Sequence, residues 1–163
     1  MVMHDELNLW IQDECWEEVL KKMPIPCVDV VVYRGREFLM GWRVIPPYRN
    51  VWALIGGRML CGESLEAAAV RHCMKSGLRI AGFRHLGVYP VIFCSRHDVV
   101  MCGAAEMKSG VLKPTGEMAR YRWYNAREIE QISPIGKNYR KMLGDWRATC
   151  VRSTLRPNRA LAE

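Results

Sequence analysis

The stretch from Trp52 to Ile80, WALIGGRMLCGESLEAAAVRHCMKSGLRI, decides the fold. It predicts a short strand over residues 51–55, stopped by Gly56 and Gly57 and followed by a loop that closes at Glu63. Adjacent glycines let a ligand approach the backbone without obstruction by a Cβ atom. The helix that follows presents one face to the same place. This arrangement indicates a site where a ligand lies against the backbone.

The helical part of this stretch has recognisable ends. Residues 65–74 are rich in Ala and Leu, which favour helix, and Ser64 precedes them as a candidate N-cap. Gly77 is a candidate C-terminal stop. The spacing therefore predicts a strand, a glycine turn and a helix, in that order.

Three residues of this stretch resemble the Nudix box. Its pattern is Gly, five residues, Glu, seven residues, then Arg-Glu-apolar-x-Glu-Glu-x-Gly-apolar. Gly57, Glu63 and Arg71 match at the required spacings, and Gly77 arrives one residue early. The resemblance implies an α/β (α+β) Nudix fold, a mixed β-sheet sandwiched between helices. It also implies that Glu63 and Arg71 form a scaffold ion pair.

The acidic part of the box is absent. Carboxylates at these helical positions share one face and jointly hold Mg²⁺ in the family. The corresponding residues here are His72, Lys75 and Ser76. Counting backward from Gly77 instead puts Met74 and Lys75 at the last two acidic positions. Neither register supplies an acid, so the usual set of magnesium ligands is incomplete.

From about residue 9 to residue 130 the chain is similar to GDP-mannose mannosyl hydrolases, a Nudix branch. The landmarks occur in the same order and at similar spacing: Pro26-Cys27-Val28-Asp29, Phe38-Leu39-Met40-Gly41-Trp42-Arg43, Gly56-Gly57-Arg58, Glu63-Ser64-Leu65-Glu66-Ala67-Ala68 and Tyr121-Arg122-Trp123. The resemblance implies a nucleoside diphosphate sugar as ligand and the possibility of a homodimer.

Carried over by position, the resemblance gives five residues a role. Asp29 would face the sugar, and Arg43 and Arg58 would neutralise the diphosphate, because guanidinium stays charged and offers a fork of donors. Gly56, through its carbonyl, and Glu117 would be the metal ligands, with Mg²⁺ as the cofactor.

The catalytic base of that branch falls at Met118, and a thioether cannot accept a proton. Two alternatives follow. Lys75 places an ammonium where the metal would lie, so that activity would survive chelation. Otherwise His97 or His72 serves as the base, since histidine titrates near neutrality. A displaced Mg²⁺ would then be held by Glu117 with one further acid (Glu63, Glu66 or Glu106).

The remaining chain predicts one mixed α and β domain over residues 1–148 and a basic tail, solvated or disordered, over residues 149–163. We expect helices over 6–22, 126–131 and 137–148. We expect strands over 28–33, 37–43, 83–93, 99–107 and 120–124, with Arg34-Gly35-Arg36 as the first hairpin turn.

Composition narrows the class. Half the residues are hydrophobic and a quarter charged, as in ordinary globular proteins. No run approaches the roughly 20 apolar residues of a membrane span, and no signal peptide is evident. The seven cysteines form no Cys-x-x-Cys pair, and we expect reduced thiols. These features predict a cytoplasmic protein without a membrane partner.

Three functions fit. The first is hydrolysis of a nucleoside diphosphate derivative such as a nucleotide sugar, and the second is binding of such a ligand without turnover. The third is RNA binding, since the formal charge is +7 and the C-terminal end is rich in Lys and Arg. No nucleic-acid-binding motif is present, so a nucleic acid partner is not expected.

Overall fold

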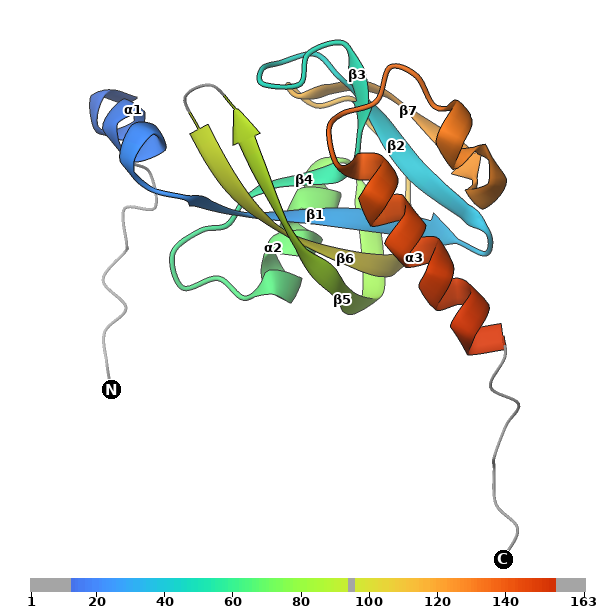
Figure 1. The fold of residues 1–163 in the computed structure, drawn as a ribbon. Coiled ribbons are helices and arrows are strands. Elements are labelled where there is room, and N and C mark those ends of the chain that lie inside the picture. Colours follow the sequence, from blue (N-terminus) through green and yellow to red (C-terminus); the bar gives the residue numbers. More distant parts are fainter. Residues whose placement is uncertain (1–12, 94–95, 155–163) are drawn as a thin grey trace, which may run out of the picture.

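A computed structural model describes residues 13–93 and 96–154. Within them the chain forms helices and strands in the order shown in Figure 1. The elements are α1 (Asp13–Lys22), β1 (Ile25–Arg34), β2 (Glu37–Arg43), β3 (Val51–Ala53), β4 (Ile55–Arg58), α2 (Leu65–Lys75), β5 (Leu78–Phe93), β6 (Arg96–Gly110), β7 (Met118–Asn125), the 3₁₀ helix η1 (Ala126–Gln131) and α3 (Tyr139–Thr154).

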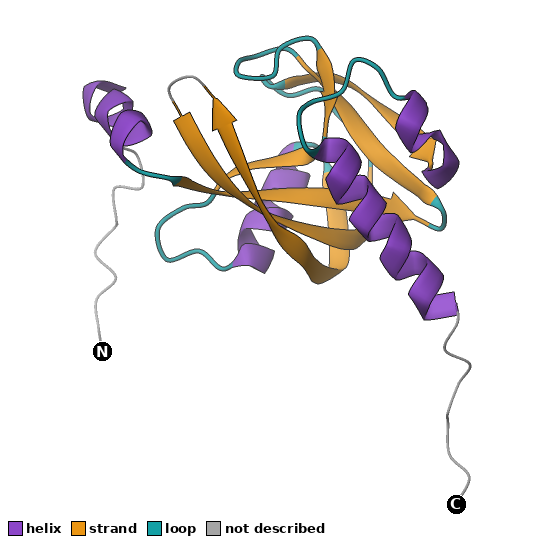
Figure 2. Cartoon of the chain, viewed as in Figure 1, coloured by secondary structure: helices purple, strands orange, loops and turns teal. Residues whose placement is uncertain are grey.

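The strands form one mixed sheet. Its main path runs β3-β2-β1-β6-β5, while β4 pairs with β1 and β7 pairs with β2. The central β1 and β6 are parallel, and β5 and β6 form a long antiparallel hairpin. Helices α2 and α3 lie on opposite faces of this sheet (Figure 2). The predicted fold, a mixed sheet sandwiched between helices, is confirmed.

Strand β1 is apolar along almost its whole length because both of its faces are covered. Val28, Val30 and Val32 pack with Ala68 and its neighbours on α2. The alternate positions, including Val31, pack in the cluster that contains α3. Asp29 interrupts this second row, so a carboxylate lies where the strand pattern requires an apolar side chain.

Helix α2 has the ends that the sequence predicts. The Ser64 hydroxyl accepts a hydrogen bond from the Ala67 amide at 3.2 Å, which caps the N-terminus. The helix ends at Lys75, and Gly77 two residues later has a φ of +83°. Here the local sequence alone fixed the boundaries.

Arg71 of α2 binds two partners in the preceding loop and strand. Its Nε and Nη2 donate to the two Glu63 carboxylate oxygens at 2.6 and 2.7 Å, and Nη2 also donates to the Arg58 carbonyl at 3.0 Å. Glu63 in turn accepts from the Leu60 amide at 3.0 Å. This network fixes α2 against β4 and the loop between them.

Several predicted boundaries were wrong. Gly56 and Gly57 do not stop a strand but belong to β4, because pairing with β1 continues through them. Strands β5, β6 and β7 extend beyond the predicted ends because they pair along their length. Helix α3 continues to Thr154, into the segment predicted as a tail. The first part of the predicted 6–22 helix lies outside the described residues.

Membrane-spanning helices and the state of the cysteines are the next features of the described residues. No helix among residues 13–93 and 96–154 is long and apolar enough to cross a membrane. Six of the cysteines lie in the described part of the chain and are free thiols, three of them buried.

We predict that Glu63→Gln lowers the free energy of unfolding by about 1–3 kcal/mol, because it leaves a half-buried guanidinium without its counter-charge. Urea denaturation at pH 7 measures the change. Glu106→Gln is the matched control, since the Glu106–Lys108 pair is exposed on both sides and should contribute about 0.5 kcal/mol. Equal losses in the two variants would contradict the role given to Glu63.

Candidate functional site

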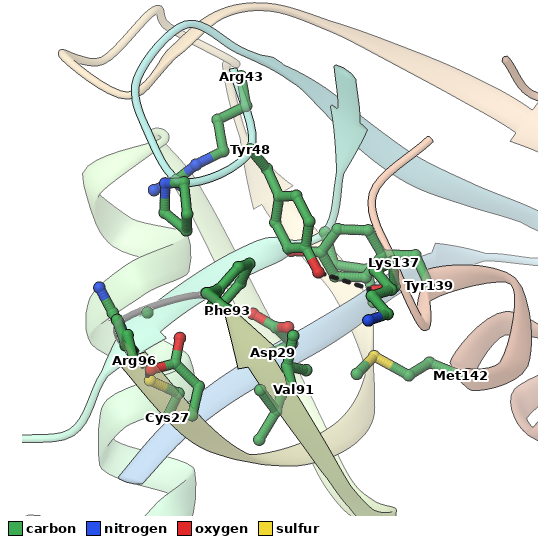
Figure 3. A pocket seen from close by; sticks show the side chains of 16 residues that line it. Cys27, Asp29, Arg43, Tyr48, Val91, Phe93, Arg96, Lys137, Tyr139 and Met142 are labelled. Atoms are coloured by element: carbon green, nitrogen blue, oxygen red, sulfur yellow. Dashed lines mark hydrogen bonds and ion pairs between the residues drawn. The ribbon is translucent and has the colours of Figure 1, made fainter. Parts of the chain in front are cut away.

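Two cavities meet at Gly56. The first, which we call the inner cavity, lies between β1, the loop before β3, the end of β5 and the start of α3 (Figure 3). The second, which we call the outer groove, lies between the last turn of α2 and the loop before β7. Because Gly56 lines both, a ligand spanning them would pass over the glycine strand.

Asp29 forms the floor of the inner cavity. Asp29 is only 8% exposed, and its carboxylate accepts no hydrogen bond from any described residue. Burial raises its pKa to about 7, against a smaller lowering by Arg43. A buried carboxylate that is open to a cavity but has no protein donor is suited to a ligand that brings N–H or O–H groups.

Gly56 is required for this arrangement. It pairs with Asp29 across the β1–β4 ladder, and a Cβ atom at Gly56 would lie 2.1 Å from Asp29 Oδ1. Gly57 is equally constrained, because its Cβ would lie 2.8 Å from His72 Cε1. The two glycines thus allow β1 and α2 to approach the same stretch of backbone.

Aromatic rings form the walls of the inner cavity. Tyr48 packs edge-on against Phe93 with ring centroids 5.1 Å apart, and lies 5.8 Å from the Tyr139 ring. Figure 3 shows Tyr48, Tyr139 and the exposed Lys137 around the Asp29 side chain. The cavity therefore combines aromatic walls with the Asp29 carboxylate at its floor and the Arg96–Asp98 ion pair in its lining, which suits a ring or sugar that carries polar hydrogens.

Arg43 and Glu117 lie between the two cavities. The Arg43 Nη1 donates to Glu117 Oε2 at 2.8 Å, and Nη2 donates to the Pro46 carbonyl at 3.2 Å. Arg43 lines the inner cavity and Glu117 the outer groove. Arg43, which was predicted to bind the diphosphate, therefore lies beside the site. Its charge is balanced by Glu117, which was predicted to bind the metal.

The outer groove holds the residues that replace the acids of the box. His72, Lys75 and Ser76 line it together with Lys113 and Glu117. The His72 Nε2 lies 3.1 Å from the Arg58 carbonyl, which can only accept, so this nitrogen carries the proton. Burial first, and then Arg71 and Lys75, lower the His72 pKa. The imidazole is therefore neutral at pH 7 and bound to β4.

These residues do not fit a magnesium ion. Mg²⁺ requires several oxygen ligands in octahedral geometry. The groove offers Glu117, which is already paired with Arg43, while Lys75 contributes a positive charge. No cluster of three acids, histidines or cysteines exists in the part of the chain that the structure describes. No step of a mechanism is therefore assigned to a metal.

Two predicted site residues lie elsewhere. The Arg58 guanidinium stacks on the Trp16 ring of α1, 4.3 Å from its centroid, and lines neither cavity. His97 lines a third cavity beside α1 and not the outer groove that His72 and Lys75 line. In both cases the arrival of α1 at this end of the sheet, which local sequence does not reveal, determines the surroundings.

Sequence reasoning missed several residues of the site, among them Tyr48, Lys113, Lys137 and Tyr139. Three of these residues lie in loops, which have no strand or helix periodicity, and Tyr139 is the first residue of α3. The available signal was indirect, because Asp29 stands alone within a run of valines and such a buried acid requires neighbours. That signal does not reveal which residues the neighbours of Asp29 are.

A model of the NUDIX domain matches residues 23–145. The chain belongs to the Nudix family. This Nudix chain is 28% identical over 128 residues to the NAD-capped RNA hydrolase NudC of Pectobacterium carotovorum, covering 77% of this chain and 48% of that protein. It is also 28% identical over 153 residues to the NudC of Yersinia enterocolitica, covering 91% and 57%. It thus spans about half the length of these curated relatives.

Solved Nudix structures share the fold. A NUDIX hydrolase from Nitrosomonas europaea superposes with a TM-score of 0.68 at 16% identity, over 77% of this chain and 90% of that chain. The NUDIX domain of Shewanella oneidensis NrtR, solved with ADP ribose, gives 0.67 at 19% identity, over 79% and 90%. The two NudC relatives are named for NAD-capped RNA, whereas the sequence resemblance suggested GDP-mannose.

We predict that Asp29→Asn stabilises this Nudix domain at pH 8 by about 2 kcal/mol. A raised pKa means that the folded state holds the proton more tightly than the unfolded chain. The free energy of unfolding of the wild type therefore falls as the pH rises from about 4 to 7. The Asp29→Asn variant should not show this dependence on pH, because the amide does not titrate. Urea denaturation from pH 5 to pH 8 measures it.

The control is Asp145→Asn, because hydrogen bonds from Tyr89 and Lys141 lower the Asp145 pKa. Loss of that carboxylate should destabilise the fold at pH 8, the opposite sign. A gain from Asp29→Asn that does not depend on pH would show that Asp29 is not titrating in this range.

Proposed function

We propose that this chain binds a nucleoside diphosphate derivative across the two cavities and has lost metal-dependent hydrolysis. The observation that carries the proposal is the shared lining residue Gly56, which separates an unpartnered carboxylate from a cationic groove. The diphosphate would lie in the outer groove. The group attached to it would enter the inner cavity.

The chemistry of the inner cavity narrows the attached group. Asp29 requires hydrogen-bond donors, and the Tyr48 and Phe93 rings offer an apolar wall. A sugar provides hydroxyl donors, and a nucleobase or a carboxamide-bearing ring provides N–H donors. GDP-mannose, which the sequence resemblance suggests, and NAD, which the names of the relatives suggest, both contain such groups beside a pyrophosphate.

Loss of metal-dependent turnover follows from the replaced acids. His72 donates to the Arg58 carbonyl, Lys75 is cationic, and Ser76 accepts from the Tyr121 hydroxyl at 2.9 Å. None of the three is a carboxylate, which would hold Mg²⁺ or take a proton from water. Binding without turnover is therefore the first candidate function.

Hydrolysis of the same class of ligand is the second candidate. Glu117 supports it, because this acid lines the groove together with Gly56, and the curated relatives are hydrolases. A retained activity would need Glu117 released from Arg43. Product analysis by chromatography, with Mg²⁺, with Mn²⁺ and with EDTA, distinguishes the two candidates.

We predict that a nucleotide ligand raises the melting temperature by roughly 5–10 °C at about 100 times its dissociation constant. The panel consists of NAD, ADP-ribose, GDP-mannose and a short RNA with and without a 5′-NAD cap. Differential scanning fluorimetry gives the shift. Stabilisation by RNA irrespective of the cap would instead favour the RNA-binding hypothesis.

Asp29→Asn should reduce the shift for the best ligand, because an amide offers one acceptor oxygen where a carboxylate offers two. Asp145→Asn is the matched control and should leave that shift within experimental error, since Asp145 lines neither cavity. The absence of any shift across the nucleotides would refute the proposed function.

A further inference from the structure

Positive charge is concentrated in the outer groove. Lys75 and Lys113 both line it and both are exposed. Neither ammonium group forms an ion pair or hydrogen bond with another residue in the described ranges 13–93 and 96–154. By contrast, the lysines of α1 and Lys108 of β6 are paired with glutamates.

The negative charge of the groove is already balanced. Glu117 is held at 2.8 Å by Arg43, whose side chain is only 16% exposed. Burial lowers the pKa of His72, and its Nε2 already contacts the Arg58 carbonyl at 3.1 Å. The two lysines therefore leave a net positive potential at the place where the family holds its metal.

Two hydroxyl groups complete the lining. The buried Ser76 Oγ accepts from Tyr121, which leaves the Ser76 hydroxyl hydrogen for another acceptor. Thr115 Oγ1 accepts from the amides of Glu117 and Met118 at 3.2 and 3.0 Å, with the same consequence. Two ammonium groups and two hydroxyl donors around one groove match the oxygens of linked phosphates.

We propose that the outer groove binds pyrophosphate directly, with Lys75 and Lys113 in place of a divalent metal. This inference deepens the proposed function and rests on it for the rest of the ligand. Two lysines carry the same total charge as one Mg²⁺, but as separate, strongly hydrated point charges. Mg²⁺ bound to free pyrophosphate lowers its charge, so magnesium should weaken the interaction.

Isothermal titration calorimetry with inorganic pyrophosphate, in EDTA and in excess Mg²⁺, tests the proposal. We expect wild-type binding in EDTA and weaker binding in Mg²⁺. Lys75→Met and Lys113→Met should each weaken binding in EDTA about tenfold, the effect of losing one charge-assisted contact. Lys75→Arg should retain most of the affinity.

Lys21→Met is the matched control. It removes the same charge from α1, where Lys21 pairs with Glu18 at 3.7 Å, and should change the affinity less than twofold. If wild-type binding requires Mg²⁺, if pyrophosphate does not bind at all, or if Lys75→Met binds like wild type, the inference is overturned. Pyrophosphate binding without any nucleotide-induced thermal shift would instead refute the proposed function and retain the anion site.

Discussion

The contact between Arg71 and its partners Glu63 and the Arg58 carbonyl determines how the rest of the site is built. The guanidinium binds the carboxylate through two nitrogens and reaches the backbone of β4 with one of them. Since β4 pairs with β1, this one side chain connects α2, the loop before it and the central sheet. The outer groove is lined by residues of α2 and β4, and the inner cavity by residues of β1 and β4.

Once α2 and β1 are this close to β4, side chains are excluded from two of its positions. Gly56 faces Asp29 and Gly57 faces the His72 ring at distances that no Cβ atom tolerates. Backbone therefore forms the boundary between the inner cavity and the outer groove. At Gly56 the proposed ligand would meet backbone atoms, with the Arg43–Glu117 ion pair beside it.

Electrostatics differ sharply on the two sides of the boundary. In the inner cavity a carboxylate is buried without a donor, which raises its pKa to about 7 and costs stability when it ionises. In the outer groove, Lys75 stands at an acidic position of the Nudix box, and Lys113 lines the same groove. A site that binds anionic ligands through cationic side chains has no need of a divalent ion to offset the phosphate charge.

Local patterns in the sequence were sufficient for the architecture. The hairpin around Gly35, the Ser64 cap, the glycine end of α2 and the spacing from Glu63 to Arg71 depend on residues close together in the chain. Their physics is local, namely turn geometry, capping and helical periodicity. The missing acids of the box were also evident from the sequence alone.

Only the tertiary structure decided where the site's long side chains go. Arg43 pairs with Glu117, 74 residues away, and Arg58 turns to Trp16 of α1, although the sequence assigned both arginines to the diphosphate. Likewise, β4 continues through the two glycines because β1 supplies its hydrogen-bonding partners. A flexible charged side chain adopts the direction of its nearest partner, and that partner is brought near only when distant segments pack together.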